Sequence, residues 1–339
     1  MEVKSLTTNE IIKKLFIAFS KKDEDEFYKL AEELIELEKR KKHNILAKEL
    51  KEALYYKNSN IHGQKEKRFR TNKPIPRDND TGFPLLEIKK FDYLDWEQLI
   101  LSDKTKYELE QIIRGYKSYE ILATYNLHPK SKILFCGLPG TGKTYSAQMI
   151  SSILHIPLVY VNFDAIISSY LGETASNLRK VFDFIKDDLW VVLFDEVDII
   201  GKNRDDHHET GEIKRVVNNF LQMLDNFDGD SLIIASTNHP HILDPAIWRR
   251  FDEVIQFDLP EANQRYKMLV QFLKPLKKED NINFDYIVEE TENFSPSDLK
   301  SMCKEAMINA ILNGRDTVTN SDLNYSVNRF KERLELRNV

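Results

Sequence analysis

Five short apolar runs, separated by longer segments of mixed character, form the central pattern of the chain. Each run is too short for an average helix and is bounded by polar or turn-forming residues, which predicts a buried strand. The segments between the runs carry apolar residues at helical spacing, so strands and helices alternate. This alternation predicts an α/β fold with a five-stranded parallel sheet between helices. The predicted strands are residues 132–136, 158–162, 189–195, 231–237 and 253–257.

The two ends of the chain have a helical pattern without strands. Apolar residues recur at helical spacing among balanced charges in residues 5–58, and the helical pattern returns after Pro260. Prolines and turn-forming pairs between the first helical region and the α/β region predict a linker. We expect a helical domain over 1–58, a linker over 59–92, an α/β domain over 93–260 and a small helical domain over 261–339. Outside 1–58, helices are expected at 107–125, 145–154, 265–273, 285–290, 297–313 and 321–336.

Charge and composition narrow the expected partners. The 339 residues carry 55 acidic and 49 basic side chains, a net charge of −6, so the chain lacks the basic footprint of most nucleic-acid-binding proteins. No apolar run is long enough to cross a bilayer, and no N-terminal secretion signal is visible. Cys136 and Cys303 are expected to be buried, reduced thiols. These features predict a cytoplasmic protein with no membrane partner and disfavour nucleic acid as a partner.

Residues 137–144, Gly-Leu-Pro-Gly-Thr-Gly-Lys-Thr, match the phosphate-binding pattern G-x-x-x-x-G-K-[ST] between a predicted strand and a predicted helix. Glycines let the backbone wrap a polyphosphate, and the N–H groups at the helix start face the anion. Lys143 is expected to reach the β- and γ-phosphates of ATP, and the Thr144 hydroxyl to ligate Mg²⁺. The predicted nucleotide contacts are Pro139, Gly140, Thr141, Gly142, Lys143, Thr144, Tyr145 and Asp195.

Asp195 and Glu196 directly follow the apolar run at 189–194. A strand that ends in two acids delivers carboxylates to the C-terminal edge of a parallel sheet, where ligands bind in such folds. Asp195 can hold Mg²⁺ together with Thr144, and Glu196 can act as the general base for the attacking water. This pair predicts Mg²⁺-dependent hydrolysis of ATP rather than binding alone.

With these motifs, residues 95–330 resemble the AAA family of ATPases, and the resemblance extends to three further segments. Residues 235–240 resemble the strand that ends in the sensor-1 asparagine, which implies that Asn238 contacts the γ-phosphate or the attacking water. Residues 243–252 resemble the segment that carries arginine fingers. Arg249 and Arg250 are adjacent here instead of spaced R-x-x-R, which leaves open which one acts and whether the other pairs with an acid. Residues 293–299 resemble the lid segment, with Asn293 and Pro296 in place of two glycines.

Residues 168–174 resemble the first pore loop of the family, so Tyr170 and Leu171 are expected to grip a polypeptide by apolar contact. The resemblance implies a homo-oligomeric ring, usually a hexamer, that passes protein substrates through its central pore. The chain is most similar to stand-alone prokaryotic members. Some of these are encoded beside subtilisin-like serine proteases, which makes such a protease a candidate partner.

Two other functions stay open at this point. One is a clamp-loader-like ATPase that depends on nucleic acid, and the other is a regulatory switch that binds ATP and controls a partner protein with little turnover. The role of residues 1–58 is also open, because a solvated helical bundle and a docking domain for a partner or substrate have the same composition.

Overall fold

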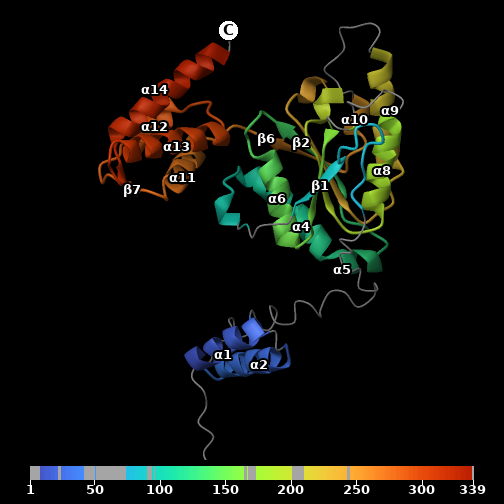
Figure 1. Ribbon diagram of the computed structural model, residues 1–339, viewed down its shortest axis with the longest axis horizontal. Helices are drawn as coiled ribbons and strands as arrows, with labels where there is room; N and C mark the ends of the chain where they lie inside the picture. Colours follow the sequence, from blue (N-terminus) through green and yellow to red (C-terminus); the bar gives the residue numbers. More distant parts are fainter. Residues whose placement is uncertain are drawn as a thin grey trace, which may run out of the picture. The chain divides into compact units, whose positions relative to one another are not determined.

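The computed structural model describes residues 8–21, 24–41, 50, 74–89, 94, 96–163, 166, 173–200, 210–242 and 245–337 (Figure 1). The chain forms two compact units, residues 1–71 and 72–339, and each is considered by itself. In the first unit, α1 (Thr8–Lys21) packs against α2 (Glu24–Arg40) through a small apolar cluster. Its buried members are Ile11, Ala18, Leu30 and Leu34.

The second unit contains a six-stranded sheet with the strand order β1-β3-β4-β5-β2-β6. The five predicted strands are all present, and all of them run parallel. This result confirms the α/β fold class. The parallel strands are β2 (Lys132–Gly137), β3 (Leu158–Val161), β4 (Val191–Phe194), β5 (Leu232–Thr237) and β6 (Glu253–Phe257).

The sixth strand, β1 (Leu86–Lys89), pairs antiparallel with β3 and was not predicted. It lies in the segment 59–92 that the sequence pattern assigned to a linker, so part of that segment belongs to the sheet. The residues before it are also anchored, since the carboxylate of buried Asp78 accepts a hydrogen bond of 2.6 Å from the Asn177 side chain. Only two residues of β1 are apolar, and the neighbouring prolines argue against a strand in the sequence pattern. For these reasons so short an edge strand was not predicted.

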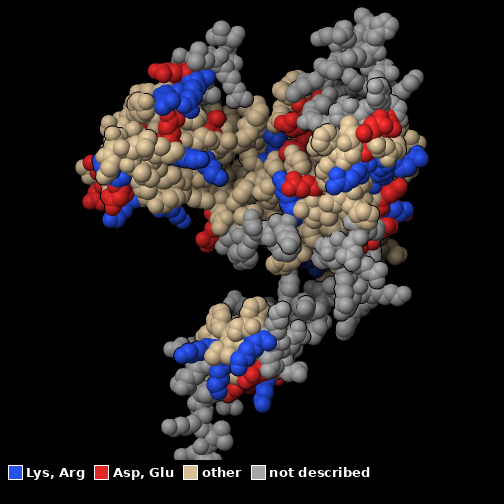
Figure 2. All heavy atoms as spheres, in the orientation of Figure 1, with Lys and Arg blue, Asp and Glu red and all other residues tan. Residues whose placement is uncertain are grey.

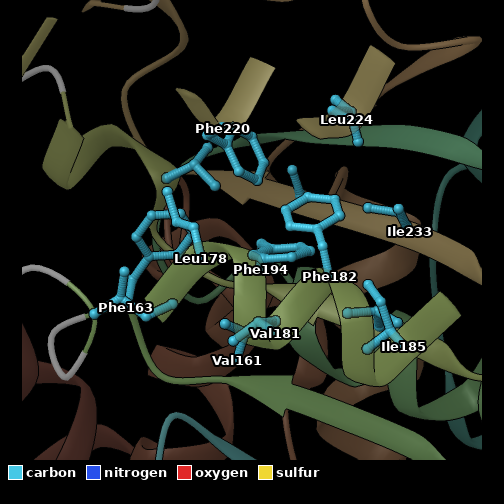
Figure 3. Close-up of a cluster of buried hydrophobic side chains, with 14 of the residues drawn as sticks. Val161, Phe163, Leu178, Val181, Phe182, Ile185, Phe194, Phe220, Leu224 and Ile233 are labelled. Carbon is cyan, nitrogen blue, oxygen red and sulfur yellow. The ribbon is translucent and has the colours of Figure 1, made fainter. Parts of the chain in front are cut away.

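Helices cover both faces of the sheet. On one face, α4 (Asp103–Lys117) and α6 (Lys143–Leu154) bury an apolar cluster with the inner strands. On the other, α8 (Thr174–Lys186) and α9 (Thr210–Asp225) pack aromatic side chains against β4 (Figure 3). There Phe220 meets Phe194 edge-on, with 5.2 Å between the ring centroids. The packing on both faces sets the positions of the strand ends.

One predicted helix is wrong in its extent. Residues 107–125 were expected to form a single helix, but the chain forms α4 and then α5 (Tyr119–Thr124), with a break at Ser118. The backbone N–H of Ser118 still bonds to the carbonyls of Arg114 and Gly115, which closes α4 in a tightened turn. Beyond β5, a short helix α10 (Pro245–Trp248) leads toward β6.

The C-terminal part of the second unit is helical, as predicted. It consists of α11 (Ala262–Phe272), α12 (Phe284–Glu290), α13 (Pro296–Leu312) and α14 (Asn320–Arg337) around a core of their own. Two unpredicted strands of two residues each, β7 (Lys277–Lys278) and β8 (Thr317–Val318), pair parallel between these helices. Cys136 and Cys303 are free and buried, in agreement with the sequence prediction. Among the described residues, no helix combines the length and apolar character needed to cross a bilayer.

Candidate nucleotide-binding site

The predicted phosphate loop connects β2 to the start of α6 and depends on its glycines. Gly140 has φ +78° and Gly142 has φ +105°, both in the region that disfavours side chains. Gly137 meets a different constraint, because a Cβ there would lie 2.2 Å from the carbonyl oxygen of Phe257 in β6. The loop therefore restricts side chains by its backbone conformation at Gly140 and Gly142 and by the close approach of β6 at Gly137.

Lys143 is buried at the first position of α6. Its ammonium donates to the carbonyl oxygens of Gly137 and Leu138, at 2.8 Å each. Burial lowers the pKa of Lys143, and the charge of Asp195 opposes this shift. The ammonium thus has two neutral acceptors inside the loop, and an anion in the loop would stabilise its charge further.

The predicted Mg²⁺ ligands lie within hydrogen-bond distance of each other. The hydroxyl of Thr144 donates to Oδ2 of Asp195 across 2.9 Å, although the two residues are 51 positions apart in the sequence. A hydroxyl and a carboxylate supply the oxygen ligands that Mg²⁺ prefers, so the donor set suits the metal. Glu196 follows with φ +55°, an uncommon conformation for a residue other than glycine, and its side chain is exposed.

Asn238 lies at the same edge of the sheet, one residue after β5. Its backbone N–H donates to the buried carboxylate of Asp198, at 3.3 Å. Because β5 lies between β4 and β2 and all three strands are parallel, their C-terminal ends are neighbours. The structure therefore brings together the phosphate loop, the pair Asp195 and Glu196, and Asn238.

Two hydroxyl groups at this edge were missed by the sequence reasoning. Ser236 on β5 donates to Oδ1 of Asp195, and the Tyr160 hydroxyl on β3 donates to Oδ2 of the same carboxylate at 3.4 Å. Ser236 lies within the segment 235–240 but was given no role there, and Tyr160 belongs to none of the motifs. The only signal in the sequence is their place near the C-terminal ends of two predicted strands.

The segment expected to resemble a lid lies against the phosphate loop. The backbone N–H of Ser297 donates to the carbonyl of Gly140 at 3.2 Å. Asn293 has φ +64°, which asparagine tolerates better than most residues, and Pro296 is the first residue of α13, after the capping side chain of Ser295. The two replacements of glycine therefore leave a regular helix start at the loop.

Among the remaining predicted site residues, Tyr145 donates from its hydroxyl to Oε1 of Gln98 at 3.3 Å. Arg249 and Arg250 follow α10 and are both exposed, and Arg250 forms an ion pair with Asp225. In the described part of the chain, no carboxylate lies within ion-pair distance of the Arg249 guanidinium. Tyr170 and Leu171 fall outside the described residues, between β3 and α8.

Comparisons with known proteins identify the same regions. The family "ATPase family associated with various cellular activities (AAA)" matches residues 133–259, and the "AAA+ lid domain" family matches residues 281–325. The chain is 34% identical over 321 residues to y4kL, an uncharacterized AAA family ATPase from Sinorhizobium fredii, and the match covers 94% of each protein. It is 33% identical to a proteasome-activating nucleotidase from Saccharolobus solfataricus, over 76% of this chain and 67% of the relative. For a proteasome-activating nucleotidase from Methanocaldococcus jannaschii, the identity is 30% over 78% of this chain and 63% of the relative.

Proposed function

The chain belongs to the AAA family of ATPases, and from that premise we propose that it hydrolyses ATP with Mg²⁺ in order to unfold, remodel or translocate protein substrates. One observation carries the proposal. Lys143, Asp195 and Asn238 come from three separate strand ends and meet at one edge of the sheet. This is the set of positions that phosphate binding, metal binding and orientation of a water molecule require.

In the proposed reaction, the β- and γ-phosphates take the place of the loop carbonyls as acceptors for Lys143. Thr144 and Asp195 would hold Mg²⁺, which neutralises charge on the phosphate oxygens when it is bound. The Glu196 side chain is exposed at this edge, so its carboxylate is accessible to the attacking water and would accept its proton. Asn238 would hold that water, or the γ-phosphate, in line.

We propose that Arg249 is the main arginine finger of a homo-hexameric ring. A finger must reach into the site of the next subunit, so it needs a guanidinium that is not already engaged within its own subunit. Arg250 is paired with Asp225, whereas Arg249 is exposed beside it. The two residues would then have different roles. Arg250 would fix the end of α10, and Arg249 would enter the site of the neighbouring subunit.

Protein substrates are proposed for two reasons. Tyr170 and Leu171 have the aromatic and aliphatic character suited to gripping a polypeptide without regard to its sequence. Two relatives carry the name proteasome-activating nucleotidase, which connects those proteins with a proteolytic partner. Acidic and basic side chains are also interspersed on the visible face of the second unit (Figure 2), which offers nucleic acid no continuous basic surface in that view.

A partner protease remains a proposal, with a subtilisin-like serine protease as the candidate. We also propose a cytoplasmic location, which the two free cysteines favour, and a docking role for residues 1–58. Affinity capture with Glu196→Gln in ATP, where slow hydrolysis would retain substrates and partners, tests for the partner protease. Recovery of a subtilisin-like protease supports the candidate, whereas recovery of another protease or of none counts against it.

The central test is steady-state ATP hydrolysis by assembled wild-type rings. We expect turnover that unfolded protein stimulates, no nucleotide binding by Lys143→Ala, and nucleotide binding without turnover by Glu196→Gln. Stimulation by DNA but by no unfolded protein would support the clamp-loader-like alternative. Equal absence of turnover in the wild type and in Glu196→Gln would support the regulatory switch.

A further inference from the structure

The carboxylate of Asp195 is held from both sides by strand hydroxyls. β4, which Asp195 follows, lies between β3 and β5 in the sheet. Ser236 on β5 donates to Oδ1 and Tyr160 on β3 donates to Oδ2, where Thr144 also donates. Each oxygen of the carboxylate therefore has a donor on a neighbouring strand, in addition to the donor in the phosphate loop.

Ser236 is almost fully buried, with 1% of its surface exposed. Its hydroxyl also accepts a hydrogen bond of 3.4 Å from the backbone N–H of Glu196, and this N–H lies 3.1 Å from Oδ1 of Asp195. One hydroxyl thus contacts both acidic residues of the site. In such a buried environment, a hydrogen bond to a carboxylate is stronger than it is in water.

Tyr160 also contacts the edge strand β1, on the side of β3 away from β4. On β3 it lies between Leu193 of β4 and Glu87 of β1. The ammonium of Lys89, also on β1, lies 4.7 Å from the centre of the Tyr160 ring, which is within cation–π range. Ring and hydroxyl therefore have separate partners, so the hydroxyl can be removed while the ring keeps its packing.

We propose that Ser236 and Tyr160 are positioning residues that orient Asp195 for Mg²⁺, an inference that rests on the proposed function. When Mg²⁺ is bound, the Thr144 oxygen can ligate it through a lone pair and still donate its proton to Oδ2, but this contact restrains only one oxygen of the carboxylate. The two strand hydroxyls add one donor to each oxygen and so fix the direction of the whole group. Partners of this kind fix the direction of a ligand's lone pairs, and their loss commonly lowers metal affinity about 10- to 100-fold.

The experiment uses the full chain with Ser236→Ala and Tyr160→Phe. Two matched controls remove a buried hydroxyl that has no hydrogen-bond partner within the described residues, Ser146→Ala and Tyr116→Phe. For each protein, Mn²⁺ binding is measured by electron paramagnetic resonance with a non-hydrolysable ATP analogue. Affinity for the same analogue is measured in EDTA, and stability is measured by chemical denaturation.

We expect Ser236→Ala and Tyr160→Phe each to weaken Mn²⁺ binding about tenfold or more, with analogue affinity in EDTA unchanged. The controls should match the wild type in both binding measurements. If both folded variants bind Mn²⁺ within about twofold of the wild type, the positioning role is wrong; if Ser236→Ala does not fold, Tyr160→Phe decides alone. A wild type that binds neither the analogue nor Mn²⁺ would instead overturn the proposed function.

Discussion

Arg250 forms an ion pair with Asp225, the last residue of α9, while the adjacent Arg249 extends from the same turn without such a partner among the described residues. The pairing separates two arginines that are indistinguishable in the sequence. It ties the turn after α10 to a helix on the face of the sheet, and it is the reason for assigning the proposed finger role to Arg249.

Arg249→Ala should lower the turnover of ATP about a thousandfold or more, with nucleotide binding retained, because an arginine finger acts on charge that develops during the reaction. Arg250→Ala should have a clearly smaller effect on kcat. Both are measured by steady-state kinetics on assembled rings. Mixing inactive Arg249→Ala with inactive Lys143→Ala should restore part of the activity, because Lys143→Ala subunits would supply Arg249 to intact neighbouring sites. A larger loss in Arg250→Ala, or no restoration on mixing, would contradict the assignment.

Gly140→Ala should weaken nucleotide binding at least tenfold, measured by titration with a fluorescent ATP analogue. A Cβ there would lie 2.8 Å from Oγ of Ser295 and from Cβ of Ser297, so the loop and the start of α13 would have to separate. Gly82→Ala is the matched control, since Gly82 has a similar φ of +71° but open space around its Cβ position. The control should lose about 1–2 kcal/mol of stability with nucleotide affinity unchanged. Equal affinities in the two variants would show that contact with α13 does not matter for binding.

Asp322 should make the stability of the C-terminal helical region depend on pH. Its side chain is 2% exposed and pairs with Arg315, which holds its pKa down at about 2, below the usual 3.8. A lowered pKa in the folded state means that the stabilisation is complete above about pH 4 and disappears as the pH falls through about 2. Asp322→Asn should therefore cost about 1–2 kcal/mol at pH 7, and this cost should shrink toward pH 2.

Denaturant unfolding of the wild type and Asp322→Asn across this pH range measures the difference. Asp316→Asn serves as a control because Asp316 and its partner Lys277 are both exposed, and the change should have little effect at any pH. A difference between the wild type and Asp322→Asn that stayed constant down to pH 2 would mean that the carboxylate charge is not the source of the stabilisation.

Tyr170→Ala should leave ATP hydrolysis near the wild-type level and abolish unfolding of a protein substrate, because the proposed grip is apolar contact and takes no part in the chemistry. Tyr170→Phe keeps the ring and should retain most of the unfolding activity. Fluorescence loss of a tagged substrate, followed in parallel with phosphate release, separates the two activities. Full unfolding by Tyr170→Ala would exclude the pore assignment.

The sequence by itself determined the fold class, the five parallel strands and the residues of the phosphate loop. These features are local: a short apolar run bounded by turn-forming residues favours a buried strand over a helix by its length, and the loop needs its glycines, Lys143 and Thr144 within a few consecutive positions. The order of Asp195, Glu196 and Asn238 after later strands was also readable, because parallel strands end at a common edge.

Tertiary structure alone decided which strands are neighbours, and with that the surroundings of each site residue. Ser236 and Tyr160 meet Asp195 because β5 and β3 flank β4, an order that no local pattern encodes. Strand β1 is too short for the sequence pattern to predict it, and it is recognised only by its pairing with β3. Arg250 differs from Arg249 because it pairs with Asp225, a residue 25 positions away in the sequence. Contacts between distant residues follow from how the layers pack, so the sequence could name the chemical groups of the site but could not assign their partners.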